Sequence, residues 1–466
     1  MRYLILSTLL LLATLKTYAQ KQSLLKGVVN ETQVTSDTLD LSYSIYLPPN
    51  YSVDVPSNVI FVFDPEGEGT RASRLFSSAT DTEDFVIVSN NFPLSEELDS
   101  LDINVSRAIL VMRDVYLKIP TAQNEVYLSG LRSGARVASA VSYLVTDVNR
   151  LLLIDDVYFD PRFASRAKRN LAMGLVGRTS PNYYKMSDYF YQLNTISSDN
   201  ILYGYQDTGV WPDAAFLTVL INRLKHINEE RLKKSVPDAE YEADYRRDIV
   251  ALNLLIQNEE YLTGYDLIKD AKSDYRGHVD LGSIRDLQRE VWRLDEYKMA
   301  RKRERSGSLE ESLLVEDIAY FLEQDLLIAD FENLGYWDNR IRQFEEATKN
   351  ASRPREQEVA QRILGYIDYE VQNFLFQNKE RLIPQRIFAN VLNTLLNPKQ
   401  KESYLNIIDL SAQDEDYNTA YFYLEELLKL GYSDYEELYA IPNTQFLKIK
   451  PTYNQIIEKY LGKSKF

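Results

Sequence analysis

Short runs of hydrophobic residues recur through the first half of the chain. Residues 41–47 alternate polar and apolar side chains and stop at two prolines, which predicts a half-buried strand. Residues 59–63 and 151–154 are continuously apolar, as expected of strands buried on both faces. The complete set of predicted strands is 41–47, 59–63, 85–88, 126–128, 151–154, 171–176 and 201–205.

Helical spacing of apolar residues occurs between several of these runs, over residues 103–117 and around residues 186–193. Strands that alternate with helices at this spacing predict a parallel, doubly wound α/β sheet. We therefore expect residues 20–228 to form an α/β domain.

The pattern changes after residue 228, where β-branched runs give way to amphipathic helices rich in Tyr, Leu and Ile. Residues 229–248 are highly charged and are expected to be a linker or a solvated helix. Residues 249–466 are expected to form an all-α domain of helical hairpins.

Two places in this second half resemble tetratricopeptide repeats (TPR), in which small and large residues alternate so that helices pack closely. Gly264, Ile268 and Ala271 occupy such small, large and small positions. Ala420, Leu424 and Leu427 stand in the same places, although Leu427 is larger than the pattern prefers. The segment between them has no clear repeat, so generic helix hairpins stay the alternative.

The most informative stretch joins residues 126–128 to a helix rich in small residues. Gly130 and Gly134 flank its turn, with Arg132 between them and Ser133 next. This is the layout of a nucleophile elbow, G-x-S-x-G, in which glycines let the strand and the helix pass close to a strained residue. The elbow residue here is arginine, whose guanidinium is always protonated and is no nucleophile.

Three segments in order carry a resemblance to a known family: Tyr-Ser-Ile-Tyr-Leu-Pro-Pro-Asn-Tyr (43–51), Phe-Asp-Pro (63–65) and the elbow. Together they resemble a secreted α/β-hydrolase of the esterase type. The resemblance implies an acid on the loop after the seventh strand and a histidine just before Trp211-Pro212. These positions fall on Ser180 and Gly209, so with Arg132 each triad position carries an unsuitable residue.

Two serines, a histidine and three aspartates are the other candidates for catalytic or metal-binding chemistry. Ser129 and Ser133 flank the elbow tip, but no histidine lies in these loops. His226 is predicted to be a plain histidine on a helix surface. Asp155, Asp156 and Asp160 cluster near a strand end, where solvated acids are favoured over a metal site, so no metal and no cofactor are predicted.

The arginines of the elbow suggest another use for the crevice. Arg132 and Arg136 lie one turn apart at a helix N-terminus, which favours anions. We expect either a small-anion site there or, preferably, a plug formed by a salt bridge to one of three carboxylates. The candidate carboxylates are Asp64, Glu66 and Asp156.

Charge and composition argue against several classes of function. The formal net charge of −16 disfavours nucleic-acid binding, and the basic run at residues 299–305 is expected to be a solvated helix end. Cysteine is absent and histidine occurs only twice, so disulfides and thiolate metal sites are excluded and imidazole chemistry is scarce.

Residues 1–19 have the character of a secretory signal peptide: Arg2 precedes an apolar run, and Thr17-Tyr18-Ala19 supplies small residues for cleavage. Cleavage after Ala19 would leave Gln20 as the first residue, and this resembles signal peptides of the Bacteroidetes. No later segment is apolar enough to span a membrane. We therefore predict an exported, non-catalytic pseudo-hydrolase in the periplasm, at the outer surface or outside the cell. It would bind a protein or peptide through its helical domain; the alternatives are a hydrolase with rewired residues and small-anion binding.

Overall fold

The structure is a computed structural model that describes residues 24–34, 40–80, 85–163, 166, 170–197, 199–206, 209–377 and 382–466. The predicted signal peptide, residues 1–19, lies outside the described residues. No helix within the described ranges is both long enough and apolar enough to cross a membrane.

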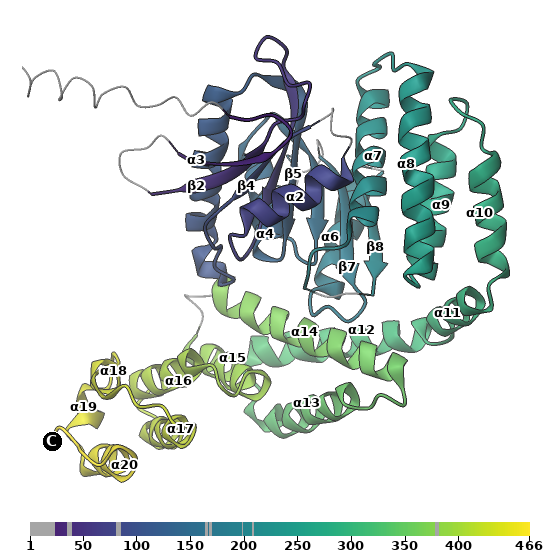
Figure 1. Cartoon of the computed structure of the whole chain (residues 1–466). Helices are drawn as coiled ribbons and strands as arrows, with labels where there is room; N and C mark the ends of the chain where they lie inside the picture. Colours follow the sequence, from purple (N-terminus) through teal and green to yellow (C-terminus); the bar gives the residue numbers. More distant parts are fainter. Residues whose placement is uncertain are drawn as a thin grey trace, which may run out of the picture.

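The first half of the chain folds into one sheet with the order β1-β2-β4-β3-β5-β6-β7-β8 over the described residues (Figure 1). Strand β2 runs antiparallel to β1 and β4, and the remaining neighbours are parallel. This order is that of an α/β-hydrolase sheet, and it confirms the predicted fold class. The strands are β1 (Val29–Gln33), β2 (Ser42–Tyr46), β3 (Ser57–Phe63), β4 (Phe85–Asn90), β5 (Thr121–Leu131), β6 (Val148–Ile154), β7 (Leu171–Gly177) and β8 (Ile201–Tyr205).

Helices cover both faces of the sheet because alternate strand residues point to opposite sides. Val59 and Phe61 pack with α3, α4 and α6 on one face, whereas Ile60 and Val62 pack with α2 and α7 on the other. The sheet is therefore doubly wound. These helices are α2 (Gly69–Ala79), α3 (Leu101–Lys118), α4 (Ser133–Leu144), α6 (Tyr183–Ile196) and α7 (Ala214–Arg231).

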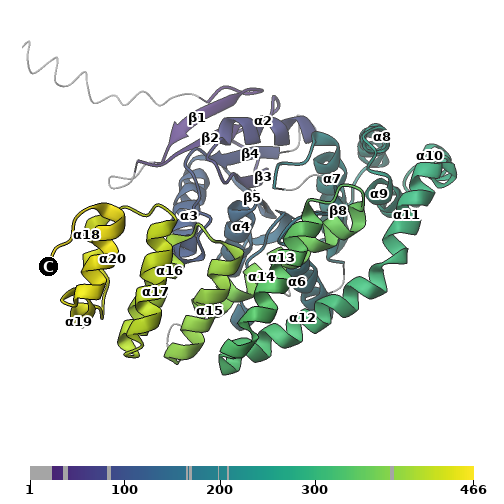
Figure 2. The same cartoon turned by 90° about the horizontal axis from the view of Figure 1, so that it is seen from below.

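The second half of the chain is helical throughout its described residues. Its helices are α8 (Asp238–Gln257), α9 (Tyr261–Asp274), α10 (Gly282–Arg293), α11 (Asp295–Ser306), α12 (Ser308–Ile328), α13 (Leu334–Thr348), α14 (Pro354–Gln377), α15 (Ile383–Leu396), α16 (Lys401–Gln413), α17 (Tyr417–Lys429), α18 (Tyr435–Ala440), α19 (Gln445–Lys448) and α20 (Pro451–Leu461). Figure 1 shows α8 to α10 beside α7, and Figure 2 shows α14 to α20 following one another towards the C-terminus.

The segment expected to be a linker or a solvated helix is structured and packed. Residues 229–231 end α7, and residues 238–248 belong to α8, which continues to Gln257. Tyr241 and Tyr245 are buried in the same hydrophobic cluster as α2 and α7. The charged residues dominate the composition of this segment, but aromatic side chains one turn apart give it a buried face.

The small residues that suggested helical repeats do allow close packing. A Cβ added at Gly264 would lie 2.6 Å from Cδ1 of Ile256 on the preceding helix. Ile268, Ala271, Ala420, Leu424 and Leu427 are all buried. Close helix pairs are thus present at both places, and a TPR origin stays a prediction.

Helix α14 docks the helical half against the end of the sheet. Arg362 donates a hydrogen bond from Nη1 to the carbonyl oxygen of Arg178, at 2.8 Å, in the loop that follows β7. One turn away, a Cβ added at Gly365 would lie 2.1 Å from Cα of Pro181 in the same loop. Only glycine at residue 365 permits this backbone approach.

We therefore predict that Gly365→Ala lowers the free energy of unfolding by about 2 kcal/mol or more, because the added methyl group must displace backbone. The matched control is Gly335→Ala in α13, where an added Cβ meets nothing within 4 Å. That control should be neutral or slightly stabilising. Urea denaturation of both variants measures the difference, and equal stabilities would contradict the docking role of Gly365.

Candidate functional site at the elbow

Arg132 forms the tip of the turn between β5 and α4, with φ 50° and ψ −117°. Few non-glycine residues adopt a positive φ, so the strained backbone of a nucleophile elbow is retained around an arginine. A Cβ at Gly134 would lie 1.9 Å from the carbonyl oxygen of Phe63, and one at Gly130 would lie 2.2 Å from the carbonyl carbon of Gly134. Both glycines are therefore required by the crossing of strand and helix.

The side chain of Arg132 is held by carboxylates from two loops. Its Nε and Nη2 donate to Oε1 of Glu96 at 2.9 and 2.8 Å, and Nη2 also donates to Oε1 of Glu66 at 3.2 Å. Partial burial by itself would lower the pKa of Arg132, but the hydrogen bonds and charges of Glu96 and Glu66 raise it above its ordinary value. The positive charge of the guanidinium is thus balanced by the two carboxylates, and the group remains protonated.

Glu96 gathers the other polar side chains of the elbow as well. Nη2 of Arg136 donates to Oε2 of Glu96 at 2.7 Å, and Oγ of Ser133 donates to its Oε1 at 3.1 Å. Sequence reasoning missed Glu96, which lies on the loop after β4 and belongs to no motif. Of the three proposed carboxylates, Glu66 pairs with Arg132 and Asp156 pairs with Arg136, whereas Asp64 has other partners.

Asp156 and Asp64 each contact residues of other loops and helices. Asp156 accepts from Nζ of Lys185 at 2.5 Å and forms an ion pair with Nε of Arg136 at 3.3 Å. Asp64 accepts from Nε1 of Trp211 at 2.7 Å and from the backbone N–H groups of Glu66 and Glu68. In hydrolases the loop after β3 supplies an oxyanion-hole donor. Here two N–H groups of that loop donate to Asp64 instead.

The structure brings the three predicted triad positions to one place. A Cβ added at Gly209 would lie 3.8 Å from Cδ of Arg132 and 3.8 Å from Oδ2 of Asp155. The N–H of Gly209 donates to that same Oδ2 at 2.8 Å. Ser180, which is buried, also hydrogen-bonds the Asp155 carboxylate. A carboxylate therefore stands beside the histidine position, at the end of β6 rather than after β7.

Asp155 is held in an unusual environment. Its φ is 58°, and its carboxyl group is buried. Burial raises the pKa of Asp155 to about 6, although hydrogen bonds from Ser180 and from the N–H groups of Gly177 and Gly209 oppose that rise. The group is thus poised to titrate near neutral pH.

Asp155, Asp156 and Asp160 do not converge on one point. Asp155 binds the loop amides, Asp156 binds Lys185 and Arg136, and Asp160 pairs with Arg162. Among the described residues, no group of three His, Cys, Asp or Glu side chains is placed to hold a metal ion.

The prediction of a surface histidine at residue 226 was wrong. His226 is only 5% exposed, its Nε2 lies 2.9 Å from Oδ2 of Asp244, and its ring lies against Tyr241 and Tyr275. The charged residues of α8 give no sequence signal that this helix covers α7. His226 belongs to the contact of α7 with α8.

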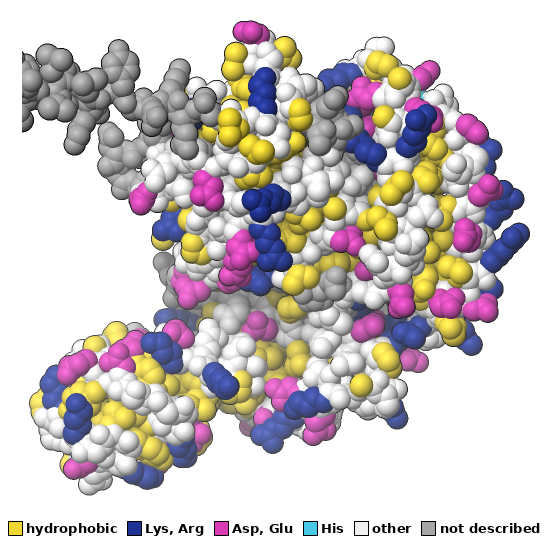
Figure 3. Space-filling view, viewed as in Figure 1, with side chains coloured by type: hydrophobic (Ala, Val, Ile, Leu, Met, Phe, Trp, Pro, Cys, Tyr) yellow, Lys and Arg dark blue, Asp and Glu magenta, His cyan; other side chains and the backbone are white. Residues whose placement is uncertain are grey.

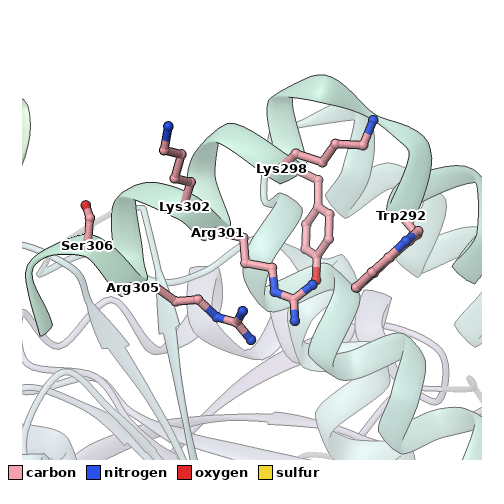
Figure 4. A pocket seen from close by; sticks show the side chains of 7 residues that line it. Trp292, Lys298, Arg301, Lys302, Arg305 and Ser306 are labelled. Carbon is pink, nitrogen blue, oxygen red and sulfur yellow. The ribbon is translucent and has the colours of Figure 1, made fainter.

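Several cavities lie away from the elbow. One of about 470 Å³ borders Arg178 and Gln206, on the loops after β7 and β8, together with α9 and α11. Another of about 400 Å³ lies between α6, α12 and α14. A third, of about 520 Å³, lies along α10 and α11 (Figure 4). None of these three is lined by Arg132.

Comparison with solved structures finds distant neighbours with esterase names. A thermostable esterase has 11% identity over 44% of this chain and 62% of its own, with a TM-score of 0.36. An arylesterase has 11% identity over 42% and 86%, at 0.33, and the thermophilic carboxylesterase EstE1, from a metagenomic library, has 12% over 43% and 89%, at 0.33. The chain thus spans less than two thirds of the first of these.

No protein-family model matches the chain, and no curated protein matches its sequence. The fold assignment therefore rests on the strand order and on the elbow backbone described above. On that basis the first half of the chain has the α/β-hydrolase fold, followed by a helical half.

The Glu96 contacts predict a measurable loss of stability. Glu96→Gln removes the charge that Arg132 and Arg136 share, and we expect the free energy of unfolding to fall by about 1–2 kcal/mol, because the site is half-exposed. Glu97→Gln, an exposed neighbour, is the matched control and should change it by less than about 0.5 kcal/mol. A loss as large in the control would contradict the bridging role of Glu96.

The raised pKa of Asp155 predicts a pH effect of defined sign. Because the folded state favours the protonated carboxyl, the wild type loses stability as pH rises from about 4 to about 6, and the loss is complete above that range. Between pH 4 and pH 7, Asp155→Asn should gain about 2–3 kcal/mol relative to the wild type.

Asp160→Asn is the control, because hydrogen bonds from Arg162 lower the pKa of Asp160 and so place its pH-dependent contribution below about pH 4. Between pH 4 and pH 7 the stability difference between Asp160→Asn and the wild type should therefore stay nearly constant. Thermal denaturation at each pH measures both, and parallel curves for Asp155→Asn and the wild type would contradict the assignment.

Proposed function

We propose that this chain is a catalytically silent protein of the α/β-hydrolase fold that acts as an exported interaction module. The observation that carries the proposal is Arg132 at the elbow tip, ion-paired to Glu96 and Glu66. A nucleophile must occupy that tip to attack an acyl carbon. A protonated guanidinium has no lone pair available for attack.

The neighbouring hydroxyl lacks a base. Ser133 donates its proton towards Glu96 and towards the carbonyl oxygen of Leu94, at 3.1 and 3.3 Å. The chain has only two histidines. His226 binds Asp244, and His278 stacks on Tyr241 at a ring-centroid distance of 3.9 Å. Both imidazoles therefore pack with helix α8, and neither is hydrogen-bonded to an elbow residue.

Small-anion binding in the crevice is the weaker candidate. Arg132 and Arg136 both contact Glu96, and they also pair with Glu66 and Asp156, respectively. An incoming anion would have to displace carboxylates that already satisfy both guanidinium groups. The plug expected from the sequence is therefore favoured over an open anion site.

The interaction role is assigned to the helical half. The helical half contains thirteen α-helices among the described residues, α8 to α20, and stacked helix pairs offer an extended surface for a protein or peptide partner. Acidic and basic side chains are interspersed over the face shown in Figure 3. We place the protein in the periplasm or at the cell surface, on the evidence of the signal-like residues 1–19.

The proposal predicts that the wild-type protein does not hydrolyse chromogenic esters above the buffer rate. Because Asp155 stands beside the histidine position, the double variant Arg132→Ser/Gly209→His supplies the two missing triad members and should raise ester turnover at least tenfold over the wild type. Adding Asp155→Asn to that variant should remove most of the gain.

Ester turnover by the wild type that Ser133→Ala abolishes would contradict the silent assignment. The variant Ser106→Ala, which changes a serine on the exposed side of α3, is the control for nonspecific effects. It should leave any measured rate unchanged.

A further inference from the structure

The cavity of about 520 Å³ on α10 and α11 is lined by cations and aromatic rings. No acidic residue is among its lining residues, which are Trp292, Tyr297, Lys298, Arg301, Lys302, Arg305 and Ser306. The cavity therefore carries positive charge within a chain of net charge −16. The sequence had suggested only a solvated helix end here.

The cations of this cavity are largely uncompensated. Lys298 pairs with Asp295 at 2.9 Å, but no carboxylate of the described residues forms a salt bridge with Arg301, Lys302 or Arg305. Arg301 and Arg305 lie one turn apart, where like charges weaken a helix by a few tenths of a kcal/mol. The chain has 69 acidic and 53 basic residues, yet Arg301, Lys302 and Arg305 have no carboxylate partner among the described residues.

Aromatic rings position one of these arginines. The guanidinium carbon of Arg301 lies 4.6 Å from the ring centroid of Trp292, a cation–π contact. Trp292 is 46% exposed and also lies against Tyr297 and Tyr265. Figure 4 shows the guanidinium groups of Arg301 and Arg305 on the same side of α11 as Trp292, whereas Lys302 extends away.

This arrangement fits a compact anion better than a long polyanion. Two neighbouring guanidinium groups suit bidentate contacts with carboxylates, and an exposed tryptophan face suits an apolar or aromatic side chain. Charges are screened over about 8 Å at physiological ionic strength, so the cavity attracts only what comes close to it. A nucleic acid or an anionic membrane would extend over the acidic remainder of the surface.

We propose that this cavity binds a short acidic peptide segment of a partner protein. Arg301 and Arg305 hold two of its carboxylates, and Trp292 packs against an apolar side chain between them. The proposal rests on the interaction role of the helical half and assigns that role a site and a ligand class.

The test uses the whole chain and a blocked peptide, Glu-Glu-Phe-Glu-Glu, with Gln-Gln-Phe-Gln-Gln as the uncharged comparison. Calorimetry should detect binding of the acidic peptide alone, weakening as salt rises. Arg301→Gln/Arg305→Gln should weaken binding at least tenfold. Tryptophan fluorescence provides a signal at the cavity, because Trp292 is exposed, whereas Trp211 is partly buried and Trp337 is buried.

The matched control removes two exposed arginines elsewhere in the helical half. Arg342→Gln/Arg353→Gln makes the same change in net charge, at residues that pair with Asp338 and Glu356. It should change peptide affinity less than twofold.

Three results would overturn the proposal: no binding by the wild type, equal binding of the uncharged peptide, or equal weakening by the control. Tighter binding of a thymidine oligonucleotide through Arg301 and Arg305 would replace the peptide with a nucleic acid. The ester assay on Arg132 is independent of this cavity, so either proposal can fail alone.

Discussion

The salt-bridge cluster around Glu96 determines what the elbow can do. One carboxylate binds Arg132, Arg136 and Ser133, and it thereby joins the loop after β4 to the start of α4. Without an acidic partner, a guanidinium held at the tip of a strained turn would be a poorly compensated charge.

The turn between β5 and α4 has the backbone of a nucleophile elbow, with an arginine at its tip. Arg132 retains a positive φ, and Gly134 still lies against the carbonyl group of Phe63. Those constraints come from the crossing of β5, β3 and α4, which the fold needs whatever residue stands at the tip. Asp155 and Gly209 also remain paired, so the loops after β6 and β8 still meet where an acid and a histidine would stand.

How much could be predicted from the sequence depended on how local each signal was. Apolar runs such as residues 59–63 and the glycine spacing at Gly130 and Gly134 predicted the sheet and the elbow, because periodicity and a missing Cβ act within a few residues. Strand β1 was missed because an edge strand of polar residues has little hydrophobic signal. Glu96 was missed because its role arises only when two distant loops meet.

The remaining wrong predictions share one cause. The composition of a segment does not show which of its side chains pack against other helices in the folded protein. Residues 229–248 were judged by their charge, yet Tyr241 and Tyr245 pack against α7. His226 was placed on a surface for the same reason. The basic run at residues 299–305 could be read from the sequence, but its cavity with Trp292 and the absence of carboxylate partners for Arg301, Lys302 and Arg305 among the described residues could not.

The most direct test of the central claim is intact-protein mass spectrometry after incubation with a fluorophosphonate, which phosphonylates activated serines. Arg132 at the tip, with Glu96 holding both Arg132 and Ser133, predicts that the mass of the wild-type protein stays unchanged. A stoichiometric adduct that maps to Ser133 or Ser129 would contradict the account, because it would require a working nucleophile and base in that crevice.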